Sequence, residues 1–203
     1  MKKETNTLKN LKENEKEMRK QLILDATLTL FGKNHISEVS MRDIAKEAGI
    51  SAALIYRHFK NRDELFMEAF IFKSNEVITT FEQTMNDKDN ISIEVIGREF
   101  IYFLVHNPLF FKMMTNFMLD YTLVEAHLER FNNVIRELLA IFDSAFKING
   151  IEEDVRIHSH AFFSALNGIM LTFYHYPGRS EEEIERHIDR LASLISSLFA
   201  NLK

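Results

Sequence analysis

Residues 40–65 read SMRDIAKEAGISAALIYRHFKNRDEL, and this stretch decides the fold of the N-terminal part of the chain. Ser40 is suited to cap a helix, and Asp43, three residues later, completes a pair resembling a capping box. Gly49 stands where the helix has to end, since glycine adopts the left-handed backbone without a steric penalty. The apolar positions between them share one helical face: Ile44, Ala45 and Ala48. We therefore predict a short amphipathic helix that stops at a glycine turn.

A second helix is predicted directly after this turn. Ser51 can cap it, and Ile55 and Phe59 continue the buried stripe. Two helices joined by a tight glycine turn within about twenty residues are typical of a helix-turn-helix, whose second helix reads the major groove of DNA. We assign this role to residues 51–58. The alternative is an ordinary helical hairpin in an all-helical protein.

The polar face of the same stretch favours DNA over the plain hairpin. After the core positions are assigned, the remaining face is rich in hydrogen-bond donors suited to phosphates or base edges. These residues are Arg42, Lys46, Ser51, Tyr56, Arg57, His58, Lys60 and Arg62.

The pattern of residues resembles the tetracycline-repressor (TetR) family of bacterial transcription regulators. The resemblance covers roughly residues 21–70 and rests on these positions: Ile44-Ala45, Ala48-Gly49-Ile50-Ser51, Ile55-Tyr56, His58-Phe59 and Arg62-Asp63-Glu64-Leu65. The sequence departs from the family pattern at Ala53, where glycine is frequent, and at Leu54, where a small polar residue is frequent. The resemblance implies a regulator that binds DNA as a dimer and is released by a small molecule.

We expect the DNA contacts to come from nine residues. Arg57 is the candidate for guanine recognition, and the two alanines that open the second helix can touch a thymine methyl group. The others are candidates for phosphate or base-edge contacts. The full set is Ser40, Arg42, Ser51, Ala52, Ala53, Tyr56, Arg57, His58 and Lys60.

Composition and charge narrow the class of protein. The chain has 203 residues, 46% of them hydrophobic, and no cysteine, which fits a reducing compartment. The N-terminus shows no hydrophobic signal region, so we expect a cytoplasmic protein. Residues 1–75 hold 14 Lys and Arg against 11 Asp and Glu, whereas the remainder holds 11 against 19. This asymmetry indicates that only the N-terminal part approaches a polyanion.

The helical periodicity, the two prolines and the absence of alternating segments predict an all-α fold of nine helices. We divide the chain into a helix-turn-helix domain, residues 1–75 with its core at 21–66 and a basic N-terminal arm, and a helical ligand-binding and dimerisation domain, residues 76–203. Before the motif, a helix is predicted to begin between residues 10 and 15 and to end near residue 32. The helices predicted after the motif cover about residues 61–85, 92–106, 107–119, 122–149, 153–176 and 180 onward. We expect Gly97 to interrupt the second of these, and Thr122 with Glu125 to cap the fourth.

The C-terminal part contains most of the phenylalanine. Phe and Met at helical spacing usually fill a core, but a cavity lined by them can also accept apolar ligands. The resemblance implies an inducer site here, between the fifth, seventh and eighth helices. Candidate lining residues are Phe100, Phe103, Met114, Phe117, Phe131, Leu138, Phe162, Leu166 and Met170, with His106, Asn167 and Tyr102 as candidate polar anchors.

The last two helices are predicted to form a dimer interface. Small residues at three- and four-residue spacing permit close helix approach, and a leucine- and isoleucine-rich stripe marks the final helix. The candidates are Ala161, Ser164, Ala165, Gly168, Ile188, Leu191, Ile195 and Leu198. Two-fold symmetry is also expected because one helix-turn-helix reads few bases, whereas a dimer presents two recognition helices one DNA turn apart. The resemblance implies a four-helix bundle between two copies.

Three other classes compete with a regulator. An enzyme finds no support, because the sequence has no glycine-rich phosphate loop, no HExxH and no cysteine nucleophile. We predict no catalytic residue, no metal site and no cofactor; His158 and His160 stand two apart and point to different helix faces. A helical ligand- or lipid-binding dimer without sequence-specific DNA binding remains the main alternative. A nonspecific DNA-coating protein is disfavoured by the net charge of −5.

Overall fold

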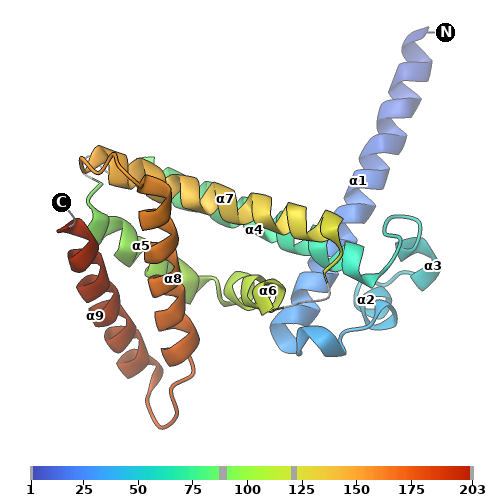
Figure 1. The fold of residues 1–203 in the computed structure, drawn as a ribbon. Helices are drawn as coiled ribbons and strands as arrows, with labels where there is room; N and C mark the ends of the chain where they lie inside the picture. Colours follow the sequence, from blue (N-terminus) through green and yellow to red (C-terminus); the bar gives the residue numbers. More distant parts are fainter. Residues whose placement is uncertain (1, 87–90, 120–122, 202–203) are drawn as a thin grey trace. The chain divides into compact units, whose positions relative to one another are not determined.

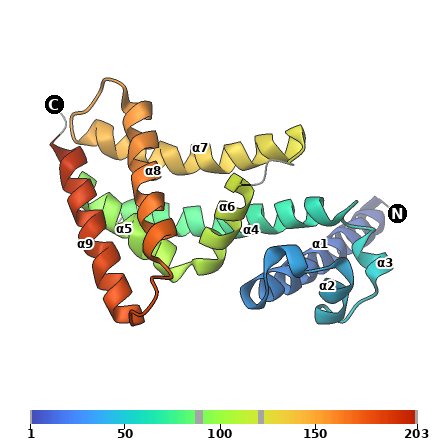
Figure 2. The same cartoon turned by 60° about the horizontal axis from the view of Figure 1, so that its bottom comes forward.

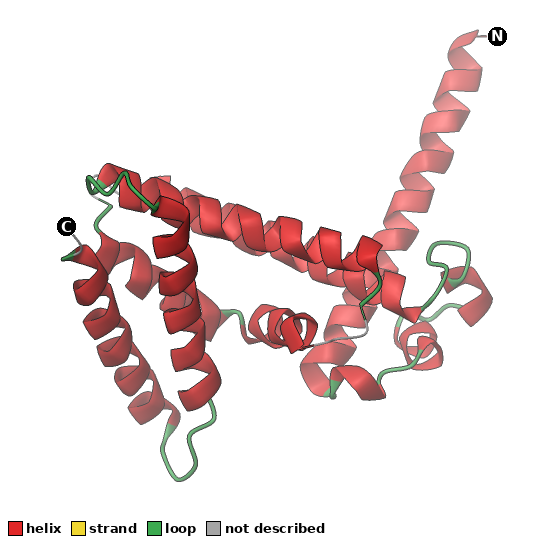
Figure 3. Ribbon diagram, viewed as in Figure 1, coloured by secondary structure: helices red, strands yellow, loops and turns green. Residues whose placement is uncertain are grey.

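The structure is a computed structural model that describes residues 2–86, 91–119 and 123–201, with the backbone alone for residues 2–10 and 84. The chain divides into two compact units, Met1–Lys73 and Ser74–Lys203. All regular secondary structure in the described residues is helical, with nine α-helices and one short 3₁₀-helix (Figure 3). This confirms the predicted all-α fold.

The first unit contains the predicted helix-turn-helix. Its elements are α1 (Lys2–Lys33), the short 3₁₀-helix η1 (Ile36–Glu38), α2 (Met41–Glu47), α3 (Ala52–Ile55) and the first turns of α4 (Arg62–Asn86). Helix α1 packs against α2, and α2 packs against α3 (Figure 1). Phe31 of α1 and Phe66 of α4 meet edge to face with ring centroids 4.5 Å apart. The core of the unit is therefore built around α1.

The second unit consists of the rest of α4 and five more helices. These are α5 (Ile93–His106), α6 (Pro108–Leu119), α7 (Glu125–Ile148), α8 (Val155–Phe173) and α9 (Glu181–Ala200). Helix α9 packs along α5, and α8 packs on both α7 and α9 (Figure 2). Phenylalanine rings of different helices contact one another. The ring centroid of Phe142 in α7 lies 5.1 Å from that of Phe100 in α5 and 5.6 Å from that of Phe162 in α8. Aromatic packing thus fills the centre of this unit.

Several predicted helix boundaries are wrong. Helix α1 begins at Lys2 rather than between residues 10 and 15, and side-chain pairs four residues apart, such as Glu15 with Arg19, support its exposed turns. Helix α3 ends at Ile55, because beyond it the backbone tightens to bonds three residues apart: the His58 N–H donates to the Ile55 carbonyl at 2.8 Å.

The C-terminal helices differ from the prediction as well. Thr122, the predicted cap of the seventh helix, lies outside the described residues, and the cap position of α7 is taken by Val124, which makes no side-chain capping bond. Helix α8 is shorter than predicted and spans Val155–Phe173, with Asp154 at its cap position.

Gly97 does not break α5, contrary to the prediction, but lets α5 and α9 approach closely. The helix runs without interruption from Ile93 to His106, and Gly97 is buried in it. A Cβ atom at this position would lie 2.0 Å from the Ser196 Oγ and 2.8 Å from the Phe162 Cζ. The glycine is therefore required by the contact between the two helices rather than by the backbone conformation.

We predict that Gly97→Ala lowers the free energy of unfolding by about 1–3 kcal/mol, because the new methyl group overpacks the α5–α9 contact. Urea unfolding followed by circular dichroism measures the change. Gly32→Ala is the control, since a Cβ there meets no atom within 4 Å. An unchanged midpoint for Gly97→Ala would show that the contact is looser than described.

Candidate nucleic-acid interface

Helix α2 begins at a complete capping box. The Ser40 Oγ accepts a hydrogen bond from the Asp43 N–H at 3.3 Å, and the Asp43 carboxylate accepts one from the Ser40 N–H at 3.0 Å. The Ser40 hydroxyl also donates to the Asp43 carboxylate, and this hydrogen bond first, followed by the one from the Ser40 N–H, holds the pKa of Asp43 below its usual value, so the carboxylate stays ionised at neutral pH. The structure confirms the predicted pair, and the pair fixes where α2 starts.

The turn between α2 and α3 depends on Gly49. Its φ is +65°, in the left-handed region where side chains are strained. The Ile50 N–H donates back to the Ala45 carbonyl at 3.0 Å, and the Gly49 N–H donates to the Lys46 carbonyl at 3.2 Å, which closes the end of α2. Ser51 then caps α3, because its Oγ accepts from the Leu54 N–H at 3.3 Å. The motif is thus a helix-turn-helix with both starts capped.

The nine candidate DNA-contacting residues come together in the segment 40–60. Their side chains extend from the start of α2, from α3 and from the turn after it. Seven are exposed: Ser40, Arg42, Ser51, Ala53, Tyr56, Arg57 and Lys60. Ala52 and His58 are half-buried. The motif therefore exposes the side chains of two arginines, a lysine and a tyrosine within twenty residues.

Arg62 has a structural position that the sequence analysis missed. We counted it among the phosphate donors, but its side chain is half-buried and points into its own unit. The Nε atom donates to the Val39 carbonyl at 2.9 Å, and Nη2 donates to the Ile36 carbonyl at 2.7 Å. The guanidinium also lies 4.3 Å above the Phe66 ring. Arg62 therefore ties the segment before α2 to the start of α4.

His58 lies beside basic residues of α1. Its pKa is lowered from the usual value of 6.5, first by burial and then by the positive charges of Lys16, Arg19 and Lys20. The imidazole is therefore neutral at pH 7. The positive charges of α1 thus lower the pKa of His58, the residue after Arg57. Sequence spacing does not show this, because the two segments are about forty residues apart.

Most candidate ligand residues are buried, but two of the three candidate polar anchors, Tyr102 and His106, lie on the surface rather than in the interior. The apolar candidates are buried except Phe117, which is half-buried: Phe100, Phe103, Met114, Phe131, Leu138, Phe162, Leu166 and Met170. His106 and Tyr102 are exposed on α5 and stack on each other at 3.9 Å, so they do not face the interior. Asn167 is buried: its Nδ2 donates to the Phe163 carbonyl at 2.9 Å, while its Oδ1 has no partner in the described part of the chain.

The candidate dimer residues lie on α8 and α9 with different exposure. Ala161, Ser164 and Leu198 are exposed, and four others are half-buried: Ala165, Gly168, Leu191 and Ile195. Ile188 is only 1% exposed. It shares the inward stripe of α9 with Ala192 and Ser196, so it packs within its own chain and is wrong as an interface residue.

Comparisons with known proteins agree with this geometry. Residues 23–69 match the model of the bacterial regulatory proteins, tetR family. The HTH-type transcriptional regulator AcrR of Shigella flexneri is 38% identical over 58 residues, which are 29% of this chain and 27% of that protein. The chain thus spans about a quarter of the length of this relative. The fatty acid metabolism regulator protein of Bacillus subtilis is 23% identical over 161 residues, or 74% of this chain and 81% of that protein.

A solved structure shows the same fold over most of the chain. It is the transcriptional regulator FadR from Bacillus subtilis in complex with stearoyl-CoA, with a TM-score of 0.70 and 19% identity over 89% of this chain and 97% of that one. The capped helices α2 and α3 form a helix-turn-helix, and the fold is the one seen in solved transcriptional regulators. Residues 23–69 are therefore similar to the part of the bacterial regulatory proteins, tetR family, that the family model describes.

The described residues contain neither a bilayer-spanning helix nor a cluster of metal-ligating side chains. None of the helices there combines the length and the apolarity that crossing a bilayer requires. The same residues contain no group of three His, Cys, Asp or Glu side chains placed to hold a metal ion.

We predict that Arg62→Ala destabilises the first unit by about 1–3 kcal/mol, because it leaves the Ile36 and Val39 carbonyls without their donor. Arg57→Ala is the matched control and should change stability by less than about 0.5 kcal/mol, since Arg57 is exposed. Thermal unfolding of both variants provides the measurement. Equal stability of the two variants would contradict the structural assignment of Arg62.

Proposed function

We propose that this protein is a cytoplasmic transcriptional repressor that binds a palindromic operator as a homodimer and is released by a small apolar or amphipathic ligand. The observation that carries the proposal is that Arg42, Tyr56, Arg57 and Lys60 of the capped motif are all exposed. Donors in this pattern suit phosphates and base edges. The similarity of residues 23–69 to the tetR family supports the same conclusion.

The residues of the motif divide into two groups by chemistry. Arg57 can donate two hydrogen bonds to a guanine edge in the major groove, and Ala52 and Ala53 can contact thymine methyl groups. Tyr56 and Lys60 bind phosphates, which orients the motif on the duplex without reading its sequence. Few base-edge donors remain on α3 itself, so phosphate contacts supply most of the affinity.

A homodimer supplies the second motif that sequence-specific binding needs. The outer face of α8 carries Ile157, Ala161, Ser164 and Leu171 at helical spacing, and Ile157 and Leu171 are 66% and 56% exposed. On α9, Leu194 and Leu198 are 57% and 60% exposed. Contiguous exposed apolar residues mark protein interaction sites. We assign this surface to the contact between two copies.

The ligand site is proposed for the aromatic interior of the second unit. FadR from Bacillus subtilis, whose fold this chain shares, was solved with stearoyl-CoA, an amphipathic acyl ligand. The interior here is lined by phenylalanine and methionine, and methionine side chains adapt to ligand shape. The free Oδ1 of Asn167 is the polar atom that can orient a ligand there, because a buried acceptor favours a donor. A ligand shifts the equilibrium only if it binds the DNA-free state more tightly.

We predict that Arg57→Ala and Lys60→Ala weaken DNA binding in different ways. Arg57→Ala should relax the preference at one base pair of each half-site by about 1–3 kcal/mol, whereas Lys60→Ala should weaken all sequences alike and reduce the salt slope of the dimer by about 2, one for each copy. Fluorescence anisotropy with duplexes from the region upstream of the protein's own gene measures both. A sequence preference unchanged by Arg57→Ala would remove it from base recognition. Failure of the wild type to prefer this region over random DNA would favour a helical ligand-binding dimer instead.

We predict that stearoyl-CoA releases the wild-type protein from this DNA and that Asn167→Leu abolishes the release. The substitution keeps the branched skeleton of four heavy atoms and removes the free acceptor, so DNA affinity without ligand should remain. Anisotropy during titration with stearoyl-CoA gives the release curve, and coenzyme A alone is the control. If Asn167→Leu responds like the wild type, the ligand site lies elsewhere. If stearoyl-CoA has no effect on the wild type, an acyl ligand is excluded.

A further inference from the structure

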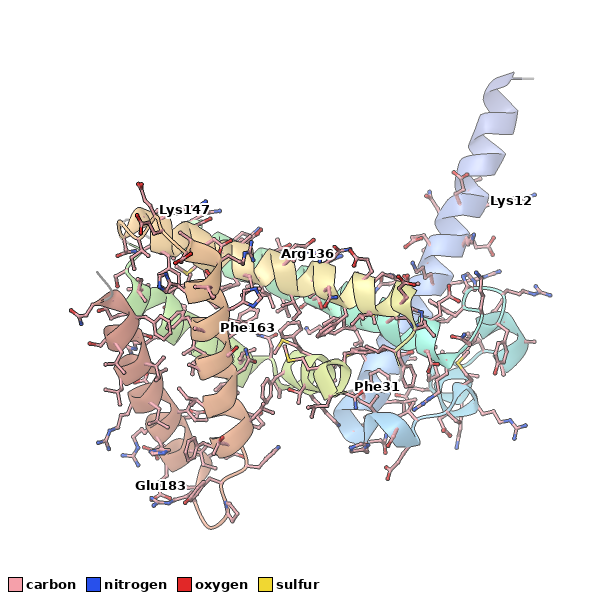
Figure 4. The ribbon with its side chains drawn as sticks, in the orientation of Figure 1. Lys12, Phe31, Arg136, Lys147, Phe163 and Glu183 are labelled. Carbon is pink, nitrogen blue, oxygen red and sulfur yellow. The ribbon has the colours of Figure 1, made fainter. Side chains whose placement is uncertain are left out.

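Helix α1 extends well beyond the part that packs in the first unit. Buried residues of α1 begin at Ile23, whereas residues 11–19 are all exposed. Figure 1 shows this N-terminal half projecting past α2 and α3, and Figure 4 shows Lys12 on the projecting part. We call residues 2–20 the α1 arm. Residues 11–19 of the arm add nothing to the hydrophobic core, so their composition calls for a different explanation.

The described basic residues of the arm share one face. Lys12, Lys16 and Arg19 follow one another at spacings of four and three residues, which places them side by side on a helix. Lys20 lies at the edge of the same face and pairs with Glu68 of α4 at 2.7 Å. This ion pair ties the inner end of the stripe to the rest of the unit. We call Lys12, Lys16 and Arg19 the basic stripe.

Two members of the basic stripe have no acidic partner. Arg19 pairs with Glu15, but Lys12 and Lys16 meet no carboxylate within ion-pair distance among the described residues. Both are exposed. Glu15 follows Lys12 by three residues and Glu13 precedes Lys16 by three, so carboxylates border the stripe, but neither lysine has an ion pair with them. The stripe therefore offers two free ammonium groups in a row, which suits a linear polyanion.

The basic stripe begins beside the helix-turn-helix. Lys16 and Arg19 are close enough to His58 to lower its pKa, and His58 follows Arg57 directly. The inner end of the stripe thus lies next to the end of the DNA-reading segment within the same unit. From Lys20 to Lys12 the helix rises about 12 Å, the length of three to four base pairs of duplex.

We propose that the basic stripe of the α1 arm binds the phosphate backbone of duplex DNA that flanks the half-site occupied by α2 and α3. This inference rests on the proposed DNA-binding function and adds a second contact region to it. A membrane surface fits the arm less well, because residues 11–20 include only two large apolar side chains, Leu11 and Met18. Helices that lie in a bilayer interface bury a broad apolar face.

The test compares two double variants on two lengths of DNA. Lys12→Ala/Lys16→Ala removes the free charges of the stripe, and Glu13→Ala/Glu17→Ala is the matched control in the same turns, with the same helix-favouring replacement. The probes are a minimal duplex, trimmed to the base pairs that the lysine variant protects upstream of the protein's own gene, and the same duplex with about ten further base pairs on each side. Fluorescence anisotropy is recorded over a series of salt concentrations.

On the longer duplex, the homodimer of the lysine variant lacks four lysines. It should bind at least about tenfold more weakly at 0.1 M salt and show a salt slope smaller by about 3 to 4, since each lost phosphate contact contributes about 0.9. On the minimal duplex, it should equal the wild type. The glutamate variant should bind both duplexes at least as tightly as the wild type.

Equal behaviour of the lysine variant and the wild type on the longer duplex overturns the proposal, as does an equal loss on both duplexes. Binding of the wild type to anionic phospholipid vesicles through Lys12 and Lys16, with no change in DNA affinity, overturns it in favour of a membrane. If the proposed function itself fails, the wild type shows no preference for the upstream region at all, which distinguishes the two failures.

Discussion

The left-handed turn at Gly49 is the constraint on which the DNA-binding unit depends. Its φ of +65° lets the Ile50 N–H donate back to the Ala45 carbonyl and turns the chain from α2 into α3 within four residues, 48–51. A residue with a Cβ is strained in this conformation even though the space around it is open. Helix α3 is only four residues long and therefore has little stability of its own. Its orientation is held by the glycine turn at Gly49 and by the burial of Ile55 and Phe59.

The polar residues of the motif divide between holding the fold and facing outward. Ser40, Ser51 and Asn61 each accept a hydrogen bond from a backbone N–H two or three residues into a helix, so their oxygens are committed to the starts of α2, α3 and α4. Arg62 is committed as well, to two carbonyls before α2. The side chains that remain available outward are Arg42, Tyr56, Arg57 and Lys60, and the basic stripe of α1 continues their charge.

Local signals made the helix-turn-helix predictable, and long-range contacts account for the errors. The capping box at Ser40 and the glycine turn involve residues at most five apart, so the sequence showed them directly. Arg62 reaches carbonyls 23 and 26 residues away, and Gly97 faces Ser196, so neither role could be read from spacing. Ile188 was predicted to face a second copy because it belongs to the apolar stripe of α9. In the structure it is buried against its own chain, which the sequence pattern could not show. The roles of the candidate DNA residues remain predictions.

The central claim is that two copies of the capped motif read one DNA site together. Hydroxyl-radical footprinting of the purified protein on the region upstream of its own gene, with excess random DNA present, tests this most directly. The account predicts two protected stretches related by two-fold symmetry, with centres about one helical turn, or a multiple of it, apart. Uniform weak protection along the whole fragment, or no protection at all, would contradict it.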